Sequence, residues 1–453
     1  MKDNSNKFSS NLGFILVSIG GAVGMGNLWR FPYFVGKYGG AVFLGLYLCI
    51  LGLFGIPLVL TEIAIGRRAQ CDATHCFPTI YEQEYGRKST LWKILGFLPL
   101  ITPLAICGYY NVVGGWAIQY FVKCLTEPLN TLNLDAFHQV TASTGPHFFY
   151  AMVCIVAANV ILLGGVKGGI EKADKIILPI LFTLLVVTAI RAVTLPGAGA
   201  GLEFLFKPNW HNVEAAGGIG PVALKALSAS FASLSIGYGS YMTFGYYLSR
   251  KESMLRGAFI IPITDTMAAM LAALTVMPMV FASGQEPGSG AGMLFGSLPL
   301  AFASMGTVGK IFATAFFLAA TFAAITSVIS LMEVGVCWLE ETYQISRFKS
   351  LLILDVFLVT VAVFCVLGYG PLSDVEFQGK NFFDFYSGYA DLLLPVSALV
   401  ISVFLGWVWK PQKALLEITN NGELEFKIAR VWAFLVKYVC PVFILIVFIM
   451  NFI

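Results

Sequence analysis

The sequence predicts an all-α, polytopic membrane protein, and three observations lead to this fold class: composition, recurring apolar segments and glycine-rich interruptions in two of those segments. Of 453 residues, 58% are hydrophobic and 12% are charged, whereas a soluble domain carries about 25% charged residues. Runs of about 20 apolar residues, the length needed to cross a hydrocarbon core about 30 Å thick, recur along the whole chain. The chain is therefore expected to cross a membrane many times.

About eleven spans follow one another within a single domain, residues 1–453. Lipid offers no partner to backbone amides, so each span must be a helix or a break that the surrounding protein shields. The expected spans are 12–37, 41–68, 91–123, 147–164, 169–191, 218–249, 254–284, 308–341, 350–370, 384–409 and 428–452. The first span contains Asn27 and Arg30 and lacks a small-residue cleavage site, so it is not expected to be a removable signal peptide.

Basic residues predict the orientation of the spans. They cluster after every second span, as at Arg67 and Arg68 or Arg250 and Lys251, and are sparser in the opposite loops. Because cytoplasmic loops are enriched in lysine and arginine, the N-terminus is expected in the cytoplasm. An odd number of spans then leaves the C-terminus outside, and the membrane is expected to be the inner membrane of a bacterium. The net charge of +3 gives no indication of nucleic-acid binding.

The sequence gives little support for a zinc site or for an enzyme. The nine cysteines are scattered, and the close pair Cys71 and Cys76, with His75 between, lacks the second ligand pair of a zinc site. No Ser-His-Asp set is apparent, and the four histidines fall in predicted loops or at span ends, so the chain is not expected to be an enzyme. A sodium channel or receptor would use the same cation-binding oxygens without alternating gates, and this alternative stays open.

Glycine runs interrupt the first and sixth spans. Residues 20–27 read GGAVGMGN and residues 233–240 read SLSIGYGS. One such run would ordinarily mean close helix packing, but two at corresponding positions favour two broken helices in inverted five-helix repeats, spans 1–5 at 12–191 and spans 6–10 at 218–409, with span 11 at 428–452 outside them. Unwound backbone offers carbonyls to a cation and amides to a carboxylate. The breaks therefore predict recognition of an anionic head group beside sodium.

The residues after the first glycine run, Asn27-Leu28-Trp29-Arg30-Phe31-Pro32, resemble the first-helix signature of the neurotransmitter:sodium symporters, the family of the bacterial leucine transporter. Residues 233–239, 169–172 and 323–327 are similar to the family's sixth-, fifth- and eighth-helix motifs. The resemblance extends through nearly the whole chain. It implies a sodium-coupled symporter that imports an amino acid by alternating access.

The resemblance also implies two sodium sites and no enzymatic cofactor. The first would use the Ala22 carbonyl, Asn27, Ser233 and Asp265; the second would use the carbonyls of Gly20, Val23 and Ala323 with the hydroxyls of Thr326 and Ser327. All of these ligands are oxygen atoms, as a hard cation requires. The hydroxyls of Thr326 and Ser327 could instead bond the backbone of their own helix.

For the substrate, the resemblance implies a pocket in which the amides of Gly24 and Gly26 and the Tyr110 hydroxyl hold a carboxylate. The implied substrate residues are Ala22, Gly24, Gly26, Ile106, Tyr110, Ser233, Ser235, Tyr238, Ser327 and Leu331. Phe231-Ala232 stands where the family commonly has two aromatics, so we expect no aromatic lid and a hydrophobic or bulky substrate. A taurine-like solute is the alternative cargo.

Gates on both sides are implied as well. Arg30 and Asp384 resemble the extracellular pair, although Asp391 could replace Asp384. Glu340 and Glu341 end the eighth span, where the family has its cytoplasmic gate acid, and Glu341 is expected to be that acid. Its usual arginine partner is replaced by Ser5, and Lys2 or Lys7 would have to substitute.

Asp265 predicts how the charge of bound sodium is balanced during transport. A carboxylate in the middle of a span is expensive and therefore read as functional. Chloride-dependent relatives have asparagine at this position and serine where this chain has Ala269. A fixed carboxylate can balance bound sodium in place of chloride, so chloride should not be needed, and return of the empty carrier with Asp265 protonated would give proton counter-transport. Gly169 and Pro179 also match a pattern in relatives whose fifth helix unwinds to release the inner sodium.

Overall fold

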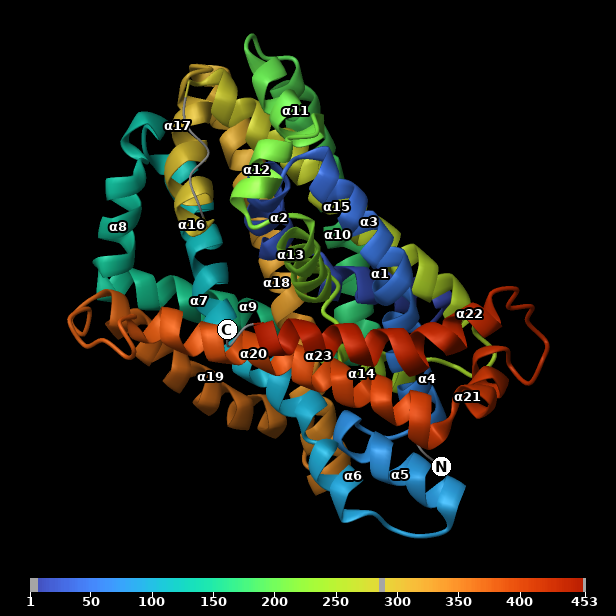
Figure 1. Ribbon diagram of the computed structural model, residues 1–453. Helices are drawn as coiled ribbons and strands as arrows, with labels where there is room; N and C mark the ends of the chain where they lie inside the picture. The colour runs from blue at the N-terminus through green and yellow to red at the C-terminus, as the bar shows by residue number, and fades with distance from the viewer. Residues whose placement is uncertain (1–6, 285–289, 451–453) are drawn as a thin grey trace.

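The computed structural model describes residues 7–284 and 290–450. Within these ranges the regular secondary structure is helical, apart from one isolated bridge between Phe377 and Lys380. Nine helices in the described residues are long and apolar enough to cross a membrane (Figure 1). They are Ala41–Ala69, Thr90–Thr126, Thr144–Leu163, Val166–Val193, Met254–Ala282, Thr307–Tyr343, Arg347–Tyr369, Phe382–Trp409 and Ala429–Ile449. The fold class predicted from the sequence is confirmed.

The two remaining predicted spans are broken. Helices α1 (Asn11–Ala22) and α2 (Met25–Lys37) form the first span and are bent by 58° relative to one another. The predicted sixth span consists of α13 (Ile219–Ser233) and α14 (Ser240–Tyr247), which the segment 234–239 separates. Both breaks fall where the glycine runs predicted them. The division into repeats at 12–191 and 218–409 stays a prediction.

The continuous spans contain several labelled elements. In chain order these are α3, η2 and α4 (Ala41–Ile50, Leu51–Gly55, Ile56–Ala69), α6 and α7 (Thr90–Leu95, Leu98–Thr126), α9 (Thr144–Leu163), η4 and α10 (Val166–Ile170, Glu171–Val193), α15 (Met254–Ala282), α18 (Thr307–Tyr343), α19 (Arg347–Tyr369), α20 and η6 (Phe382–Val403, Phe404–Trp409), and α22, η7 and α23 (Ala429–Phe434, Leu435–Val439, Cys440–Met450). Helices α20 and α23 lie side by side across the front of Figure 1.

Shorter helices gather at the two ends of the bundle. They are α5 (Ala73–Tyr85), η3 (Leu129–Thr131), α8 (Leu134–Ala142), α11 (Ala198–Phe206), α12 (Trp210–Ala215), α16 (Gly290–Gly292), η5 (Met293–Ser297), α17 (Leu298–Ala303) and α21 (Pro411–Ile418). In Figure 1, α11 and α17 lie at the top and α8 lies at the left, whereas α5 lies at the bottom near the N-terminus. The segments that follow the third, fifth and seventh spans therefore lie away from the segment that follows the second span, as expected of successive membrane crossings.

Backbone geometry explains the second break. Gly237 and Gly239 have φ angles of +88° and +67°, and Ser235 has a φ of +54°. Left-handed backbone is easy for glycine and uncommon for other residues, so the Gly-Tyr-Gly sequence favours an interruption that an ordinary helical sequence would resist. The break is thus a local property of the sequence.

The fifth span is wound in this structure. The π-helical turn η4 leads directly into α10, which continues through Pro179 to Val193. The segment between Gly169 and Pro179, which the resemblance marked as one that could unwind, is helical throughout. Unwinding would therefore require a change from the described conformation.

Helices α4 and α14 touch through glycines. A Cβ atom on Gly66 would lie 1.8 Å from the Met242 carbonyl oxygen, and one on Gly245 would lie 2.4 Å from the Ile63 carbonyl oxygen. Such contacts allow two backbones to approach more closely than larger residues permit. The half-helix after the second break is therefore packed directly onto α4.

Arg67, at the end of α4, connects this pair to α21. Its side chain is 1% exposed, and its Nε lies 2.7 Å from Glu417 Oε1. Its Nη1 donates to the Glu252 carbonyl at 2.8 Å, and its Nη2 donates to Asn420 Oδ1 at 2.8 Å. One buried guanidinium thus connects three segments that are distant in the sequence.

We expect Arg67→Met to destabilise the purified protein by about 3 kcal/mol, because removing one member of a buried ion pair leaves the other uncompensated. The neighbouring Arg68 supplies a matched control, since its pair with Glu84 is longer, at 3.8 Å, and its side chain is 36% exposed. Arg68→Met should cost about 1 kcal/mol or less. Thermal unfolding midpoints of both variants in detergent measure the difference, and equal shifts would contradict the role assigned to Arg67.

Candidate functional site

The two breaks enclose one cavity. Its walls come from α1, α2, α7, α13, α18, α20 and the segment between α13 and α14. All ten predicted substrate residues line it: Ala22, Gly24, Gly26, Ile106, Tyr110, Ser233, Ser235, Tyr238, Ser327 and Leu331. Its volume is about 80 Å³, enough for several water molecules. Residues from distant parts of the sequence thus converge where the helices are interrupted.

The first amides of α2 face this cavity wall. The Met25 N–H donates to the Tyr110 hydroxyl at 2.8 Å, and the Gly24 N–H donates to Asn27 Oδ1 at 3.2 Å. Among the described residues, no acceptor is recorded for the Gly26 N–H. The Gly24 N–H therefore already has an acceptor in this structure, whereas the Gly26 N–H has none among the described residues, and the expectation that both amides hold a carboxylate stays a prediction.

The glycines at 24 and 26 have different surroundings. A Cβ atom on Gly24 would lie 2.6 Å from the Tyr110 hydroxyl and 2.8 Å from Ser327 Oγ, whereas a Cβ atom on Gly26 would have no atom within 4 Å. The absence of a side chain at Gly24 therefore permits α2, α7 and α18 to meet. Gly26 borders open space.

Asn27, Ser233 and Asp265 form a buried polar cluster beside the cavity. Asn27 Nδ2 donates to Asp265 Oδ1 at 2.7 Å, and Ser233 Oγ donates to Asp265 Oδ2 at 2.6 Å. Asp265 is fully buried. Carboxylate, hydroxyl and amide oxygens suit a hard cation such as sodium. Three of the four residues expected at the first sodium site are therefore in direct contact, and the fourth, Ala22, lines the adjoining cavity.

The group expected at the second sodium site is only partly assembled. The last N–H bonding into α1 is that of Val23, which donates to the Ile19 carbonyl at 2.8 Å. No backbone donor is recorded for the Gly20 or Val23 carbonyl in the described residues. Ser327 Oγ donates to the Val23 carbonyl at 3.4 Å. The structure thus brings a carbonyl of α1 to a hydroxyl of α18.

Thr326 has a different arrangement. Its hydroxyl donates to the Phe322 carbonyl at 3.0 Å and to the Ala323 carbonyl at 3.3 Å. These are bonds within its own helix, which the sequence left open as the alternative. To bind an ion, the Thr326 hydroxyl would have to direct its lone pairs toward that ion. The Ala323 carbonyl, also expected at this site, already accepts a hydrogen bond from the Thr326 hydroxyl.

Comparison with known proteins identifies this architecture. A family model described as the sodium:neurotransmitter symporter family matches residues 5–134 and 131–453. The chain belongs to the sodium:neurotransmitter symporter family. A sodium-dependent transporter of Haemophilus influenzae is 32% identical over 98% of this chain and 97% of its own length. A sodium-dependent transporter of Bacillus subtilis is 31% identical over 98% of this chain and 96% of its own.

A solved structure has the same fold. It is the crystal structure of MhsT in complex with L-phenylalanine, which is 35% identical and superposes with a TM-score of 0.87 over 98% of this chain and 99% of that chain. The predicted family and fold are therefore confirmed, and the chain is a member of a transporter family rather than of an enzyme family.

The predicted contact between Arg30 and Asp384 is wrong, and the alternative with Asp391 is present. Arg30 Nη2 lies 3.6 Å from Asp391 Oδ2, and Asp391 Oδ1 also accepts from the Tyr109 hydroxyl at 2.8 Å. Asp384 lies in the first turn of α20, where its N–H and carboxylate bond the side chain of Asn381. Because the two aspartates are two helical turns apart on one face, the sequence could not choose between them.

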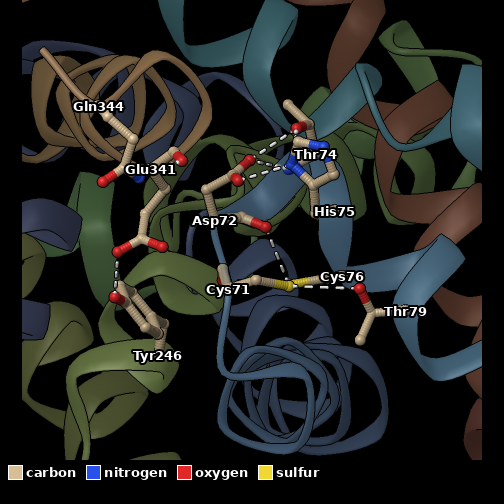
Figure 2. A network of polar contacts seen from close by, with 9 residues as sticks. All are labelled: Cys71, Asp72, Thr74, His75, Cys76, Thr79, Tyr246, Glu341 and Gln344. Atoms are coloured by element: carbon tan, nitrogen blue, oxygen red, sulfur yellow. Dashed lines mark hydrogen bonds and ion pairs between the residues drawn. The ribbon is translucent and has the colours of Figure 1, made fainter. Parts of the chain in front are cut away.

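Glu341, which was expected to be the cytoplasmic gate acid, lies near the C-terminal end of α18. Figure 2 shows Tyr246 of α14 pointing toward Glu341 of α18, and the hydroxyl donates to Glu341 Oε1 at 2.6 Å. Ser5, which stands in place of the usual arginine, and Lys2, one of the two lysines expected to substitute for it, lie outside the described residues. A half-helix that follows the second break is therefore bonded to a continuous span at this end.

Beside this contact, Figure 2 shows the segment that contains Cys71 and Cys76. Asp72 Oδ2 lies 2.7 Å from His75 Nδ1. Burial raises the pKa of the Cys76 thiol well above its usual value, which disfavours the thiolate that a metal would bind. Within the described part of the chain, no three or more histidine, cysteine, aspartate or glutamate side chains lie close enough together to hold a metal ion between them.

Near the same end of α18, Glu333 and its partner Arg347 were missed from the sequence, whereas Glu340 was noted beside Glu341. Glu333 is fully buried and accepts from the Tyr247 hydroxyl at 2.8 Å. Arg347 forms ion pairs with Glu333 and, at 3.2 Å, with Glu340, and also donates to the Leu162 carbonyl. Arg347 thus connects α9, α18 and α19, and Glu333 connects them to α14.

Glu62 was missed as well. It is fully buried in α4, and its Oε1 accepts from the Gly237 N–H at 2.7 Å. It therefore stabilises the backbone of the second break. The rule that selected Asp265, an acid within a span, would have selected Glu62 and Glu333 too.

Proposed function

We propose that the chain is a sodium-coupled secondary active symporter that imports a hydrophobic or bulky amino acid by alternating access. The observation that carries this proposal is the convergence of ten predicted substrate residues on one cavity, directly beside the Asn27–Ser233–Asp265 cluster. Relatives described as sodium-dependent transporters support the use of sodium. The MhsT complex with L-phenylalanine supports an amino acid of that kind.

The substrate carboxylate would lie at the N-terminal end of α2. There the Gly26 N–H, which has no acceptor among the described residues, can donate a hydrogen bond to the carboxylate. The positive end of the helix dipole also favours an anion at this place. The side chain would extend toward Ile106, Tyr238 and Leu331, which are apolar or aromatic and border the same cavity. Ala232 leaves additional room where an aromatic lid would otherwise stand.

Two sodium ions would couple the cycle. The first would be bound by Asn27, Ser233 and Asp265 with the Ala22 carbonyl, and the second by α1 carbonyls with Ser327 and Thr326. Asp265 supplies a negative charge that does not leave with the substrate, so we propose transport without chloride and return of the empty carrier with Asp265 protonated. Each net charge moved across the membrane contributes about 2.3 kcal/mol per 100 mV.

The proposal also includes orientation. The N-terminus and the Glu341 end would face the cytoplasm of a bacterium and the Arg30–Asp391 pair the outside, with the C-terminus extracytoplasmic. The distribution of basic residues supports this. Labelling of a cysteine introduced in the exposed loop at Asp374, in intact cells with a membrane-impermeant reagent, tests the outer assignment.

We expect Asp391→Asn to reduce uptake at limiting substrate by about tenfold, because Asp391 pairs with Arg30 and accepts a hydrogen bond from the Tyr109 hydroxyl, and a hydrogen bond to a charged group contributes about 1.5 kcal/mol. Asp384→Asn is the matched control on the same helix and should leave uptake within about twofold of wild type. Uptake into proteoliposomes at limiting substrate measures both variants. A larger loss in Asp384→Asn would restore the pairing first predicted from the sequence.

The function is tested by binding of all twenty radiolabelled amino acids to the purified protein, each with and without sodium, in chloride-free buffer. Sodium-dependent binding of one or a few apolar amino acids is expected. Competition by glycine and alanine alone would contradict a bulky substrate, and binding of taurine but of no amino acid would establish the alternative cargo. Saturable uptake driven by a sodium gradient would exclude a channel.

A further inference from the structure

Asp174, on α10, is a buried acid with an unpartnered carboxylate oxygen. The residue is 1% exposed, and among the described residues no group donates a hydrogen bond to its buried Oδ1. The nearby ammonium of Lys175 is engaged elsewhere, at 2.6 Å from Glu171 Oε1. Glu171 in turn accepts from the Ser9 N–H at 2.8 Å. Asp174 is therefore distinguished from the acid one helical turn before it, whose charge is compensated.

The carboxylate lies against α1. A Cβ atom on Gly20 would be 3.0 Å from Asp174 Oδ2 and 3.2 Å from Oδ1, so the acid occupies the space that a side chain at Gly20 would need. Gly20 is two residues before the end of α1, and no backbone donor to its carbonyl is recorded in the described chain. The C-terminal end of a helix carries partial negative charge. The Asp174 carboxylate beside the C-terminal end of α1 therefore places two negative groups together, an arrangement that a bound cation would stabilise.

The position along the two helices is informative. A Cβ on Gly13 would meet the Glu171 side chain, just as one on Gly20 would meet Asp174. Helices α1 and α10 therefore run side by side from the Gly13–Glu171 contact to the Gly20–Asp174 contact. Asp174 lies between the Glu171–Lys175 pair, at the predicted cytoplasmic end, and the break that offers carbonyls to the second sodium.

We propose that Asp174 is a sodium ligand, which binds the ion together with the Gly20 carbonyl at the contact between α1 and α10. Carboxylate and carbonyl oxygens are the donors that a hard cation prefers. Bound sodium would compensate the charge that no described protein group compensates. This inference rests on the proposed use of sodium and adds a carboxylate on the cytoplasmic side of the second sodium site.

The test uses the full-length protein in detergent without substrate, titrated with sodium against choline at constant ionic strength, with the thermal unfolding midpoint as the readout. A ligand that binds the folded state raises this midpoint. We expect Asp174→Asn to need about tenfold more sodium than wild type for the same half-maximal rise, as loss of a metal-site partner typically costs. Without sodium, the variant should unfold at a higher temperature than wild type, because an uncompensated charge has been removed.

Asp355→Asn is the matched control. Asp355 is a partly buried acid on α19 whose Oδ2 accepts from Asn159 at 2.8 Å, and its variant should keep the sodium response of wild type. Asp174→Ser provides a second neutral variant if the asparagine protein does not fold. A wild-type sodium response in either Asp174 variant would overturn the proposal, while wild-type binding of amino acid with sodium would leave the proposed function intact. Failure of sodium to stabilise wild type would also overturn it, and the amino acid panel would then decide the function separately.

Discussion

Replacement of Asp265 by asparagine should reduce sodium-driven uptake in chloride-free medium by about 100-fold. In the structure both carboxylate oxygens are acceptors, one for the Asn27 amide and one for the Ser233 hydroxyl. An asparagine side chain has the same shape but one acceptor oxygen, so one of these donors would face an NH₂ group. The variant also lacks the charge that balances sodium. Together these losses amount to about 3 kcal/mol.

The measurement is uptake into proteoliposomes under an imposed sodium gradient, with either gluconate or chloride as the anion. If the charge is what matters, chloride should restore part of the activity of Asp265→Asn, since a mobile anion can then take the place of the carboxylate. Asp355→Asn, tested beside it, should transport like wild type in both media. Undiminished uptake by Asp265→Asn without chloride, with an unchanged pH dependence, would refute the coupling role.

A methyl group at Gly24 should have the second large effect. It would lie 2.6 Å from the Tyr110 hydroxyl and 2.8 Å from Ser327 Oγ, and the Tyr110 hydroxyl is fixed by the Met25 amide. Overpacking of this kind costs about 1–3 kcal/mol. Gly24→Ala should therefore lower both the unfolding temperature and the affinity for the amino acid, by about tenfold or more in affinity.

Gly26→Ala provides the comparison, because a Cβ there would meet no atom within 4 Å. Its unfolding temperature should match that of wild type, while the methyl group, which enters the cavity, should still weaken amino acid binding. Scintillation proximity binding and thermal unfolding on the same preparations separate the two effects. Equal loss of stability in both variants would show that the close approach at Gly24 has been overestimated.

Much of the site was predictable because the breaks are encoded locally. Gly237 and Gly239 adopt left-handed backbone that other residues resist, so the interruption can be located from the sequence alone. Once the breaks are located, short motifs on either side place residues such as Ser233 and Ser327 around a common cavity. The resemblance to the family supplied the positions on α7, which no local pattern indicates.

The remainder depended on side-chain geometry. Asp384 and Asp391 are equivalent by helical spacing, and only packing of α20 against α7 brings Asp391 to Arg30 and Tyr109. The direction of the Thr326 hydroxyl is likewise a rotamer choice. Partnerships such as Glu333 with Arg347 form between helices that meet only in the folded bundle, so the sequence marks the acid but not its partner.

The glycine contacts between α4 and α14 constrain how the protein can open. Since Gly66 and Gly245 leave no space between the two backbones, α14 cannot slide along α4. The two helices should therefore rotate together as one rigid unit about the segment 234–239. An engineered disulfide between α4 and α14 should then leave turnover intact. A disulfide between α14 and α18, which would replace the Tyr246–Glu341 and Tyr247–Glu333 contacts by a permanent one, should stop the cycle with the inner side closed.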